Sequence, residues 1–402
     1  MTQTEKEHEA TTSAVTPRRF IPYRRVDLAN MLLARDVLTP QQRAHFIRTN
    51  KTVQAHFQNE FYQLRQTLKN AYAPHNPDAD TRFIGSTEDD PYAVDFSNAL
   101  VTVLERANYD KVSDKDLQRA MRASSLFQVK LDVDLRDFEE VQLYTRGASR
   151  RTEVLREFFG LWKRRVQFTN FERVVLFLRF KPNLDEDAVL IQCPPGSTMI
   201  KLFQNVPEAD IEMLFPNIRI GMRLIDKLLI GIPAIASGAA VFTTRMGATL
   251  LLLGSALGFW IGLSAEPVEL NKAALIAALA SIGALIGYGW KQFSNFRNRK
   301  LKYSQALTEN LYFRLLDNNA GVFFRVLDDA EESECKEAMV ALYFLLASNE
   351  PMTAAELDAK IEQWFKDSWN CILDFEVDDA LRKLHTLELA RCEGGRWTAV
   401  LA

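Results

Sequence analysis

Histidine and cysteine are scarce in this sequence, and their spacing does not suit metal or nucleophilic chemistry. The four cysteines lie far apart and form no CxxC pair, which argues against a zinc knuckle or a disulfide framework. The five histidines form no HExxH or HxH pattern. His45 and His56 lack a third ligand, so we expect packing or surface roles for both and no cofactor.

A strong net charge and a phosphate-binding loop are also missing. The formal net charge is −3, which gives no global electrostatic case for nucleic-acid binding. The segment GSTMIK, 196–201, lacks the GxxxxGK[ST] spacing of a phosphate loop. Cys193 precedes a turn and has no base partner that can be named, so we expect no catalytic role for it. The absence of these features favours a protein without enzymatic activity.

The N-terminal part of the chain is expected to be a polar tail followed by helices. Residues 1–18 lack the apolar core of a secretory signal, and their glutamates argue against a mitochondrial presequence. We expect a disordered tail there and a helical region over 19–126. The helical periodicity is carried by apolar side chains at Phe46, Val53, Phe57, Phe61, Leu64 and Leu68.

The period changes after a helix that begins near Asp114, where Ser113 and Asp116 form a capping-box pattern. Residues 127–135 alternate between apolar and polar side chains, which predicts a half-buried strand. Residues 174–180 are rich in β-branched and aromatic side chains. We therefore expect a small α+β domain with an antiparallel sheet over 127–227.

Two long hydrophobic runs follow, at 246–264 and 273–290, and neither contains a charge. A membrane-spanning helix needs about 20 apolar residues, with about 17 as the lower limit. We therefore predict a two-helix transmembrane hairpin over 246–290. The apolar segment 228–245 contains Gly231, Pro233 and Gly238, and it is expected to be interfacial or re-entrant, with a further crossing left open.

Basic residues flank the hydrophobic block on both sides. By the positive-inside rule, both flanks and both termini are expected to face the cytoplasm of a bacterial inner membrane, or to belong to an organellar membrane in a eukaryote. Membrane lipid is then an expected partner. The flanking cations are Arg219, Arg223, Lys227, Lys291, Arg297, Arg299, Lys300 and Lys302.

Glycines recur at four-residue spacing within the two runs, which predicts close helix packing within the hairpin or between protomers of a homo-oligomer. Neither run contains an acid, lysine or histidine, so an anchoring role is favoured over transport. The glycines are Gly254, Gly258, Gly262, Gly283 and Gly287.

The run NVPEADIEMLFP, 205–216, predicts a short helix between two prolines. Pro207 fits the first helical position, and Glu208 and Asp210 fit the first turn. Glu212 is expected on the exposed side, and Pro216 ends the element. Arg219 and Arg223 follow and could pair with these acids. We favour a structural collar over an acidic catalytic site, which would need a partner and a perturbed environment.

The C-terminal part is expected to contain a basic flank with helices over 291–334 and a separate module over 335–402. The module has three helices and then a hairpin turning at Gly394-Gly395, which is the order of a winged helix. Its third helix carries Glu376, Asp378 and Asp379 near its start. Because phosphate contacts need basic side chains, we expect a protein partner there and not nucleic acid.

A family resemblance is carried by the collar run, LYTRG, KEAMVALYFLL and the last helix. In these segments the chain resembles the family built around transmembrane protein 143. That family is domain of unknown function 3754, and the resemblance covers most of the chain. It implies no activity, cofactor or catalytic residue. The sequence thus predicts a membrane-anchored interaction or scaffold protein. The alternatives are a membrane-bound hydrolase with a site beside the collar, or a membrane-tethered winged-helix regulator.

Overall fold

The computed structural model describes residues 17–78, 95–122, 130–157, 162–183, 193–221, 261, 272–348 and 350–401. The chain divides into two compact units. The first contains residues 1–123, 134–217 and 313–402, and the second contains residues 124–133 and 218–312. The first unit is therefore assembled from three separate parts of the chain, and each unit is described by itself below.

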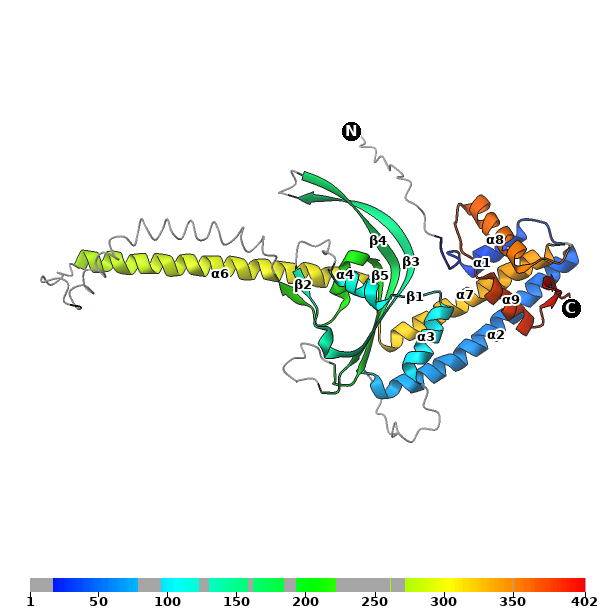
Figure 1. The fold of residues 1–402 in the computed structure, drawn as a ribbon, viewed down its shortest axis with the longest axis horizontal. Coiled ribbons are helices and arrows are strands. Elements are labelled where there is room, and N and C mark those ends of the chain that lie inside the picture. Colours follow the sequence, from blue (N-terminus) through cyan, green and yellow to red (C-terminus); the bar gives the residue numbers. More distant parts are fainter. Residues whose placement is uncertain are drawn as a thin grey trace. The chain divides into compact units, whose positions relative to one another are not determined.

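A long central helix organises the first unit. Helix α7 (Ala320–Leu346) has 27 residues, and most of them from Val322 onward are buried. It lies beside α2 (Pro40–Tyr72) and α3 (Phe96–Arg106) and also contacts α1 (Arg25–Leu33) (Figure 1). A helix surrounded on several sides can be apolar around most of its circumference, which is why α7 lacks a clean amphipathic stripe.

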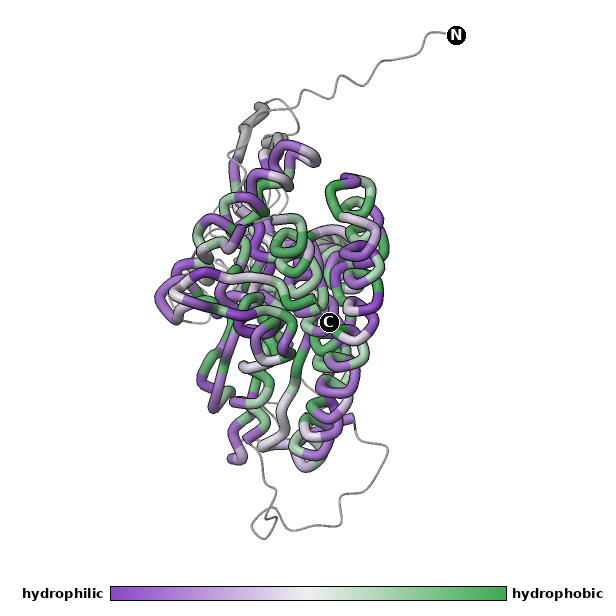
Figure 2. The backbone as a smooth tube through the Cα atoms, turned by 90° about the vertical axis from the view of Figure 1, so that its right-hand side faces the viewer, coloured by the Kyte–Doolittle hydropathy of each residue, from purple (hydrophilic) through white to green (hydrophobic). Residues whose placement is uncertain are grey.

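Helix α2 shows how local sequence sets a boundary in this unit. The Thr39 hydroxyl accepts a hydrogen bond from the Gln42 backbone, and the Gln42 side chain accepts one from the Thr39 backbone, while Pro40 stands at the first helical position. Hydrophobic and hydrophilic residues alternate along the helices (Figure 2), and in α2 the hydrophobic ones enter the core. The apolar positions expected at helical spacing, such as Phe46, Phe57 and Phe61, are buried.

A five-stranded sheet has the order β1-β3-β4-β5-β7, and each neighbouring pair is antiparallel. This confirms the predicted antiparallel sheet and α+β class. Sequence reasoning did not identify β7, which returns to the edge of β5 from far along the chain. The strands are β1 (Asp110–Lys111), β3 (Phe138–Glu157), β4 (Trp162–Phe180), β5 (Thr198–Pro207) and β7 (Leu315–Asn318).

The two faces of this sheet are covered by different elements. Tyr144, Phe177 and Ile200 belong to the same hydrophobic core as the residues of α2, α3 and α7. On the other side, the 3-10 helix η3 (Glu208–Leu214) contacts β4, β5 and α4 (Asp114–Arg122). Phe138 packs against Phe180 and Phe215 there, with ring centroids 5.3 and 6.2 Å away. Short 3-10 helices η1 (Ala73–His75) and η2 (Leu135–Asp137) complete the connections.

The C-terminal module has the predicted order of helices and hairpin. Helix α8 (Ala354–Trp369) begins at a capping box between Thr353 and Glu356, as expected. It is followed by α9 (Val377–Thr386), β8 (Ala390–Glu393) and β9 (Arg396–Ala399). Gly394 and Gly395 both have positive φ angles, 57° and 78°, which the two-residue turn between antiparallel strands requires.

In the second unit, β2 (Lys130–Asp132) pairs with β6 (Arg219–Gly221). The unit also contains most of helix α6 (Lys272–Arg314), which has 43 residues. The predicted strand at 127–135 is thus three residues long where it is described. The predicted second membrane span, 273–290, is the beginning of α6. The first span, 246–264, and segment 228–245 lie outside the described residues.

Within the described part of the chain, we find no helix with both the length and the apolar character that a bilayer crossing requires. The predicted transmembrane hairpin is therefore wrong, and so are the membrane location and multi-pass topology that depended on it. The prediction considered residues 273–290 by themselves. In the structure these residues begin a helix that continues without interruption through the basic segment to Arg314.

Candidate functional site

The middle of α7 contains charged and polar side chains at positions that are otherwise core. Ser333, Glu334 and Glu337 are buried, and Glu334 is only 2% exposed. Removing a charge from water is costly unless a partner and hydrogen bonds compensate it. The partners of these residues therefore decide what this part of the molecule does.

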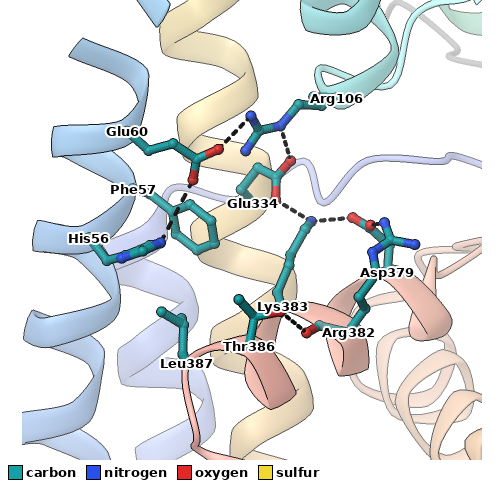
Figure 3. A pocket seen from close by; sticks show the side chains of 10 residues that line it. All are labelled: His56, Phe57, Glu60, Arg106, Glu334, Asp379, Arg382, Lys383, Thr386 and Leu387. Atoms are coloured by element: carbon teal, nitrogen blue, oxygen red, sulfur yellow. Dashed lines mark hydrogen bonds and ion pairs between the residues drawn. The ribbon is translucent and has the colours of Figure 1, made fainter. Parts of the chain in front are cut away.

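Glu334 lies between two cations that come from different helices. Its Oε1 accepts a hydrogen bond from Arg106 Nε at 2.7 Å, and its Oε2 lies 2.5 Å from Lys383 Nζ. Arg106, at the end of α3, also donates to Glu60 of α2 at 2.8 Å (Figure 3). Lys383 of α9 forms a further ion pair with Asp379 one turn earlier. We call these five residues the Glu334 cluster.

A second group of contacts supports the same region. Glu337 Oε2 lies 2.8 Å from Lys383 Nζ, and its Oε1 accepts hydrogen bonds from Ser333 and Asn108. Asn108 has a positive φ angle of 59°, which asparagine tolerates better than most residues, and its side chain also donates to Ser333. Four elements, α2, α3, α7 and α9, are therefore joined by charge-assisted hydrogen bonds.

A cavity of about 270 Å³ lies beside the Glu334 cluster. Its cations Arg106, Arg382 and Lys383 all have carboxylate partners within the same lining. A charged ligand would have to displace one of these pairs, so the arrangement suits a clamp between helices better than a binding site. The lining consists of His56, Phe57, Glu60, Arg106, Glu334, Asp379, Arg382, Lys383, Thr386 and Leu387.

Burial and ion pairing shift the pKa values of the cations in this region in opposite directions. Burial would lower the pKa of Arg106, but the ion pairs with Glu334 and Glu60 outweigh it and raise that pKa. On the other side of α7, burial lowers the pKa of Lys336, although Glu332 opposes this shift. The Arg106 guanidinium therefore keeps its charge across the whole physiological pH range.

An N-terminal segment ties the sheet to the C-terminal module. Arg18 donates to Glu172 of β4 at 2.7 Å, and its backbone is hydrogen bonded to both Ile372 and Asp374. Arg19 forms ion pairs with Asp110 and Glu376. We call residues 18–21 the N-terminal strap. It holds the start of α9 through Glu376, whereas the Glu334 cluster holds Lys383 near the end of the same helix.

The collar residues occupy a buried turn under the sheet. Pro207 ends β5 and precedes η3, so it stands one position before the first helical residue. Asp210 is 1% exposed and lies 3.5 Å from Arg314 at the end of α6. Glu212 is also buried, although the sequence predicted an exposed position, because the tight 3-10 winding turns it inward. Glu208 is half-buried, and Pro216 follows the buried Phe215.

The other predicted positions are spread over the second unit. Arg219 lies on β6, while Lys291, Arg297, Arg299, Lys300 and Lys302 lie on α6. Gly283 and Gly287 lie on α6 as well, and a methyl group added at either would meet no atom within 4 Å. Arg223, Lys227, Gly254, Gly258 and Gly262 are outside the described residues.

His45, His56 and Cys193 each have a local explanation. His45 is buried and hydrogen bonded to Thr49, and His56 lies 3.8 Å from Glu60. Across the described ranges, no group of three potential metal ligands comes together. Burial and then the charge of Asp78 raise the pKa of the Cys193 thiol, so it stays protonated at neutral pH.

Sequence reasoning missed the Glu334 cluster, whose members are far apart in the chain. One local signal was available. The run EESECKE, 331–337, places five charges inside an otherwise apolar helical stretch. Charges at core positions of a helix need partners from elsewhere, and this requirement could have identified the region, although not the identity of Arg106 or Lys383.

Comparison with known proteins supports one part of the resemblance. Residues 171–321 match a family described as a protein of unknown function, DUF3754. The match covers less than half of the chain and runs from β4 through η3 and α6 to the start of α7. It does not confirm the narrower likeness to transmembrane protein 143. No solved structure matches the chain.

Proposed function

We propose that this protein is a non-enzymatic interaction protein whose C-terminal winged-helix-like module recognises a protein partner. The observation that carries the proposal is the position of Lys383. In winged-helix proteins that bind DNA, basic side chains of the third helix reach phosphates and bases. Here Lys383 is held by Glu334, Glu337 and Asp379 of its own chain.

The charge of the remaining module surface supports a protein partner over nucleic acid. Asp358, Glu362, Asp374 and Asp378 lie close enough to interact electrostatically. Burial, followed by repulsion from the other three acids, raises the pKa of Asp358 to about 6. A phosphate backbone would be repelled by this group, whereas a basic polypeptide segment would be attracted.

The rigid attachment of α9 suits recognition by a preformed surface. The Glu334 cluster and the N-terminal strap fix both ends of the region that contains α9. Pre-ordered side chains lose less entropy on association, which improves affinity without additional contacts. The collar acids are the alternative centre for a hydrolase. Their burial and the Asp210–Arg314 ion pair are explained by packing, so we do not propose catalysis there.

Site-specific photo-crosslinking in cells tests this proposal. A photoreactive amino acid would replace Asp378 or Arg391 in the module, and Lys51 on α2 would serve as an equally exposed control. We expect a discrete protein adduct from the module positions and none from Lys51. Identical adducts from all three positions, or no adduct from the module, would contradict the proposal. An adduct with the mass of two copies would identify a homo-oligomer as the partner.

A further inference from the structure

Helix α6 carries a row of large apolar side chains that are exposed to solvent. Each of the other described helices has at most two exposed residues of this kind, whereas α6 has five between residues 276 and 293. Their exposed fractions lie between 57% and 72%. A contiguous apolar patch larger than a few hundred Å² is rare on a monomer and marks a surface that binds a partner. We call these five residues the apolar stripe. They are Ile276, Leu279, Ile286, Trp290 and Phe293.

The spacing of the apolar stripe is that of a seam between two helices. When Gly283 is counted with it, successive positions are three, four, three, four and three residues apart. This repeat of 3.5 residues keeps the positions on one line of a helix that packs its side chains between those of a second helix. Gly283 is also exposed, and a methyl group added there would meet no atom within 4 Å. The line is therefore open to a second helix.

An antiparallel copy of α6 fits the apolar stripe layer by layer when the two-fold axis passes midway between residues 283 and 286. Each layer then combines a larger side chain with a smaller one, which allows facing positions to interdigitate without voids. The same positions supply both sides, as an interface between two identical subunits requires. The layers are Ile276 with Phe293 of the partner subunit, Leu279 with Trp290 of the partner subunit, and Gly283 with Ile286 of the partner subunit.

A parallel arrangement of the two helices fits less well. It would place Trp290 against Trp290 of the partner subunit and Gly283 against Gly283 of the partner subunit, so one layer would be overfilled and another left empty. Residues 291–302 contain five basic residues and no acidic one. These segments would lie side by side in a parallel pair. In the antiparallel pair their centres would be about 36 Å apart, far beyond the screening length of about 8 Å.

The area of the apolar stripe matches that of a specific interface. An aromatic side chain can bury about 150–250 Å², so Trp290 and Phe293, at 72% and 57% exposure, together offer about 200–300 Å². Their rings already pack against each other, with centroids 6.2 Å apart. The aliphatic side chains continue this surface over about 26 Å of helix. Two α6 helices overlapping along residues 272–297 thus approach the 800 Å² or so that each partner of a stable complex contributes.

We propose that two copies of this chain associate through an antiparallel pair of α6 helices, with the apolar stripe as the seam. The second copy is the occupant because the stripe is complementary to itself in the size of its layers and in the placement of its flanking charge. This association is independent of the protein partner proposed for the C-terminal module, because α6 and the module share no residue. Crosslinking from Asp378 to a different protein should therefore persist when the helix pair is disrupted.

Sedimentation velocity of the full-length chain tests the inference. We expect a species with twice the 45.9 kDa mass of one chain at micromolar concentration. Ile286→Glu adds a charge to each of the two central layers and should raise the dissociation constant at least about 100-fold, because a buried charge without a partner is strongly disfavoured. Leu279→Glu should act in the same way. Both positions are exposed in the single chain, so the helix content measured by circular dichroism should not change.

The matched control is Asn298→Glu, which adds the same charge to α6 at an exposed position beyond the last layer. Its dissociation constant should stay within about fivefold of that of the unmodified chain, because exposed charges contribute little. A monomer at all concentrations would overturn the proposal and assign the apolar stripe to a different occupant. A dimer that Ile286→Glu and Leu279→Glu leave intact would also overturn it, as would equal losses from these variants and the control.

Disulfide formation between differently tagged chains tests the direction of the helices. Ile276→Cys on one copy faces Phe293→Cys on the other in the antiparallel pair. Two copies of Ile276→Cys would be about 26 Å apart, whereas a disulfide needs Cα atoms within about 7 Å. We expect the mixed product, and no Ile276→Cys homodimer above the background of the unmodified chain, in which Cys392 is exposed. An Ile276→Cys homodimer as abundant as the mixed product would overturn the antiparallel arrangement.

Discussion

The Glu334 cluster and the acidic group around Asp358 on the C-terminal module place charged side chains in opposite surroundings. In the cluster, Arg106 and Lys383 come from separate helices and meet carboxylates of α2, α7 and α9. In the module, Asp358 lies near three further acids, Glu362, Asp374 and Asp378, whose repulsion adds to burial in raising its pKa. In the first region charges of opposite sign are paired within the fold, whereas in the second charges of one sign are gathered.

The difference shows how the location of the partner determines the role of a charge. A buried cation needs a counter-charge in the same chain, so its replacement is expected to affect stability. A surface group of like charges gains little from its own fold and is available to an external group of opposite charge. Substitutions in the two regions should therefore change stability in opposite directions.

The largest effect is expected for Glu334→Gln, which leaves two cations in a buried site without their shared carboxylate. Breaking a buried pair from one side typically costs about 3–5 kcal/mol. Urea denaturation followed by tryptophan fluorescence measures this change in the free energy of unfolding. Glu60→Gln is the control, since Glu60 is 41% exposed and surface pairs contribute about 0–1 kcal/mol. Equal destabilisation by both variants would show that the two acids are not distinguished by burial.

A smaller loss is expected for Gly147→Ala in β3. Gly147 has a φ angle of 71°, and an added Cβ would lie 2.9 Å from Glu172 Cδ, the carboxylate carbon of the Arg18 partner. A non-glycine residue in such a conformation costs about 1–3 kcal/mol. Thermal denaturation measures it. Gly321→Ala, at a position with an ordinary φ angle, places the added Cβ 3.1 Å from the side-chain oxygen Asp317 Oδ1 and should change stability by less than about 1 kcal/mol.

The smallest effect is expected at the acidic surface of the C-terminal module. Asp358 has a pKa raised to about 6, so the folded chain holds this proton more tightly than the unfolded chain does. The ionised Asp358 carboxylate therefore destabilises the folded chain. This effect is complete above pH 6 and disappears as the pH falls toward 4. Asp358→Asn should therefore add a few tenths of a kcal/mol at pH 7.5, after solvent screening, and nothing at pH 4. Thermal midpoints at the two pH values test this sign.

Local patterns in the sequence predicted the features that depend on neighbouring residues. The capping box at Thr353, the hydrogen bond from the Asp116 backbone to the Ser113 hydroxyl, the helical spacing of apolar residues in α2 and the turn at Gly394-Gly395 are present because each is determined within a few residues. The hydrophobic run at 273–290 was misinterpreted, since hydropathy alone does not say where a helix ends. Arg106 and Glu334 are 228 residues apart, and no local rule relates such positions.

Strand β7 marks the point where the chain returns to the first unit. The chain leaves the first unit after Asn217, and it re-enters at Phe313 to lay β7 against β5 of the same sheet. The chain thus departs just after η3 and returns at the strand that pairs with β5. Such an arrangement allows the intervening segment to be lengthened, shortened or exchanged over evolution, while the helices and sheet that frame it keep their register.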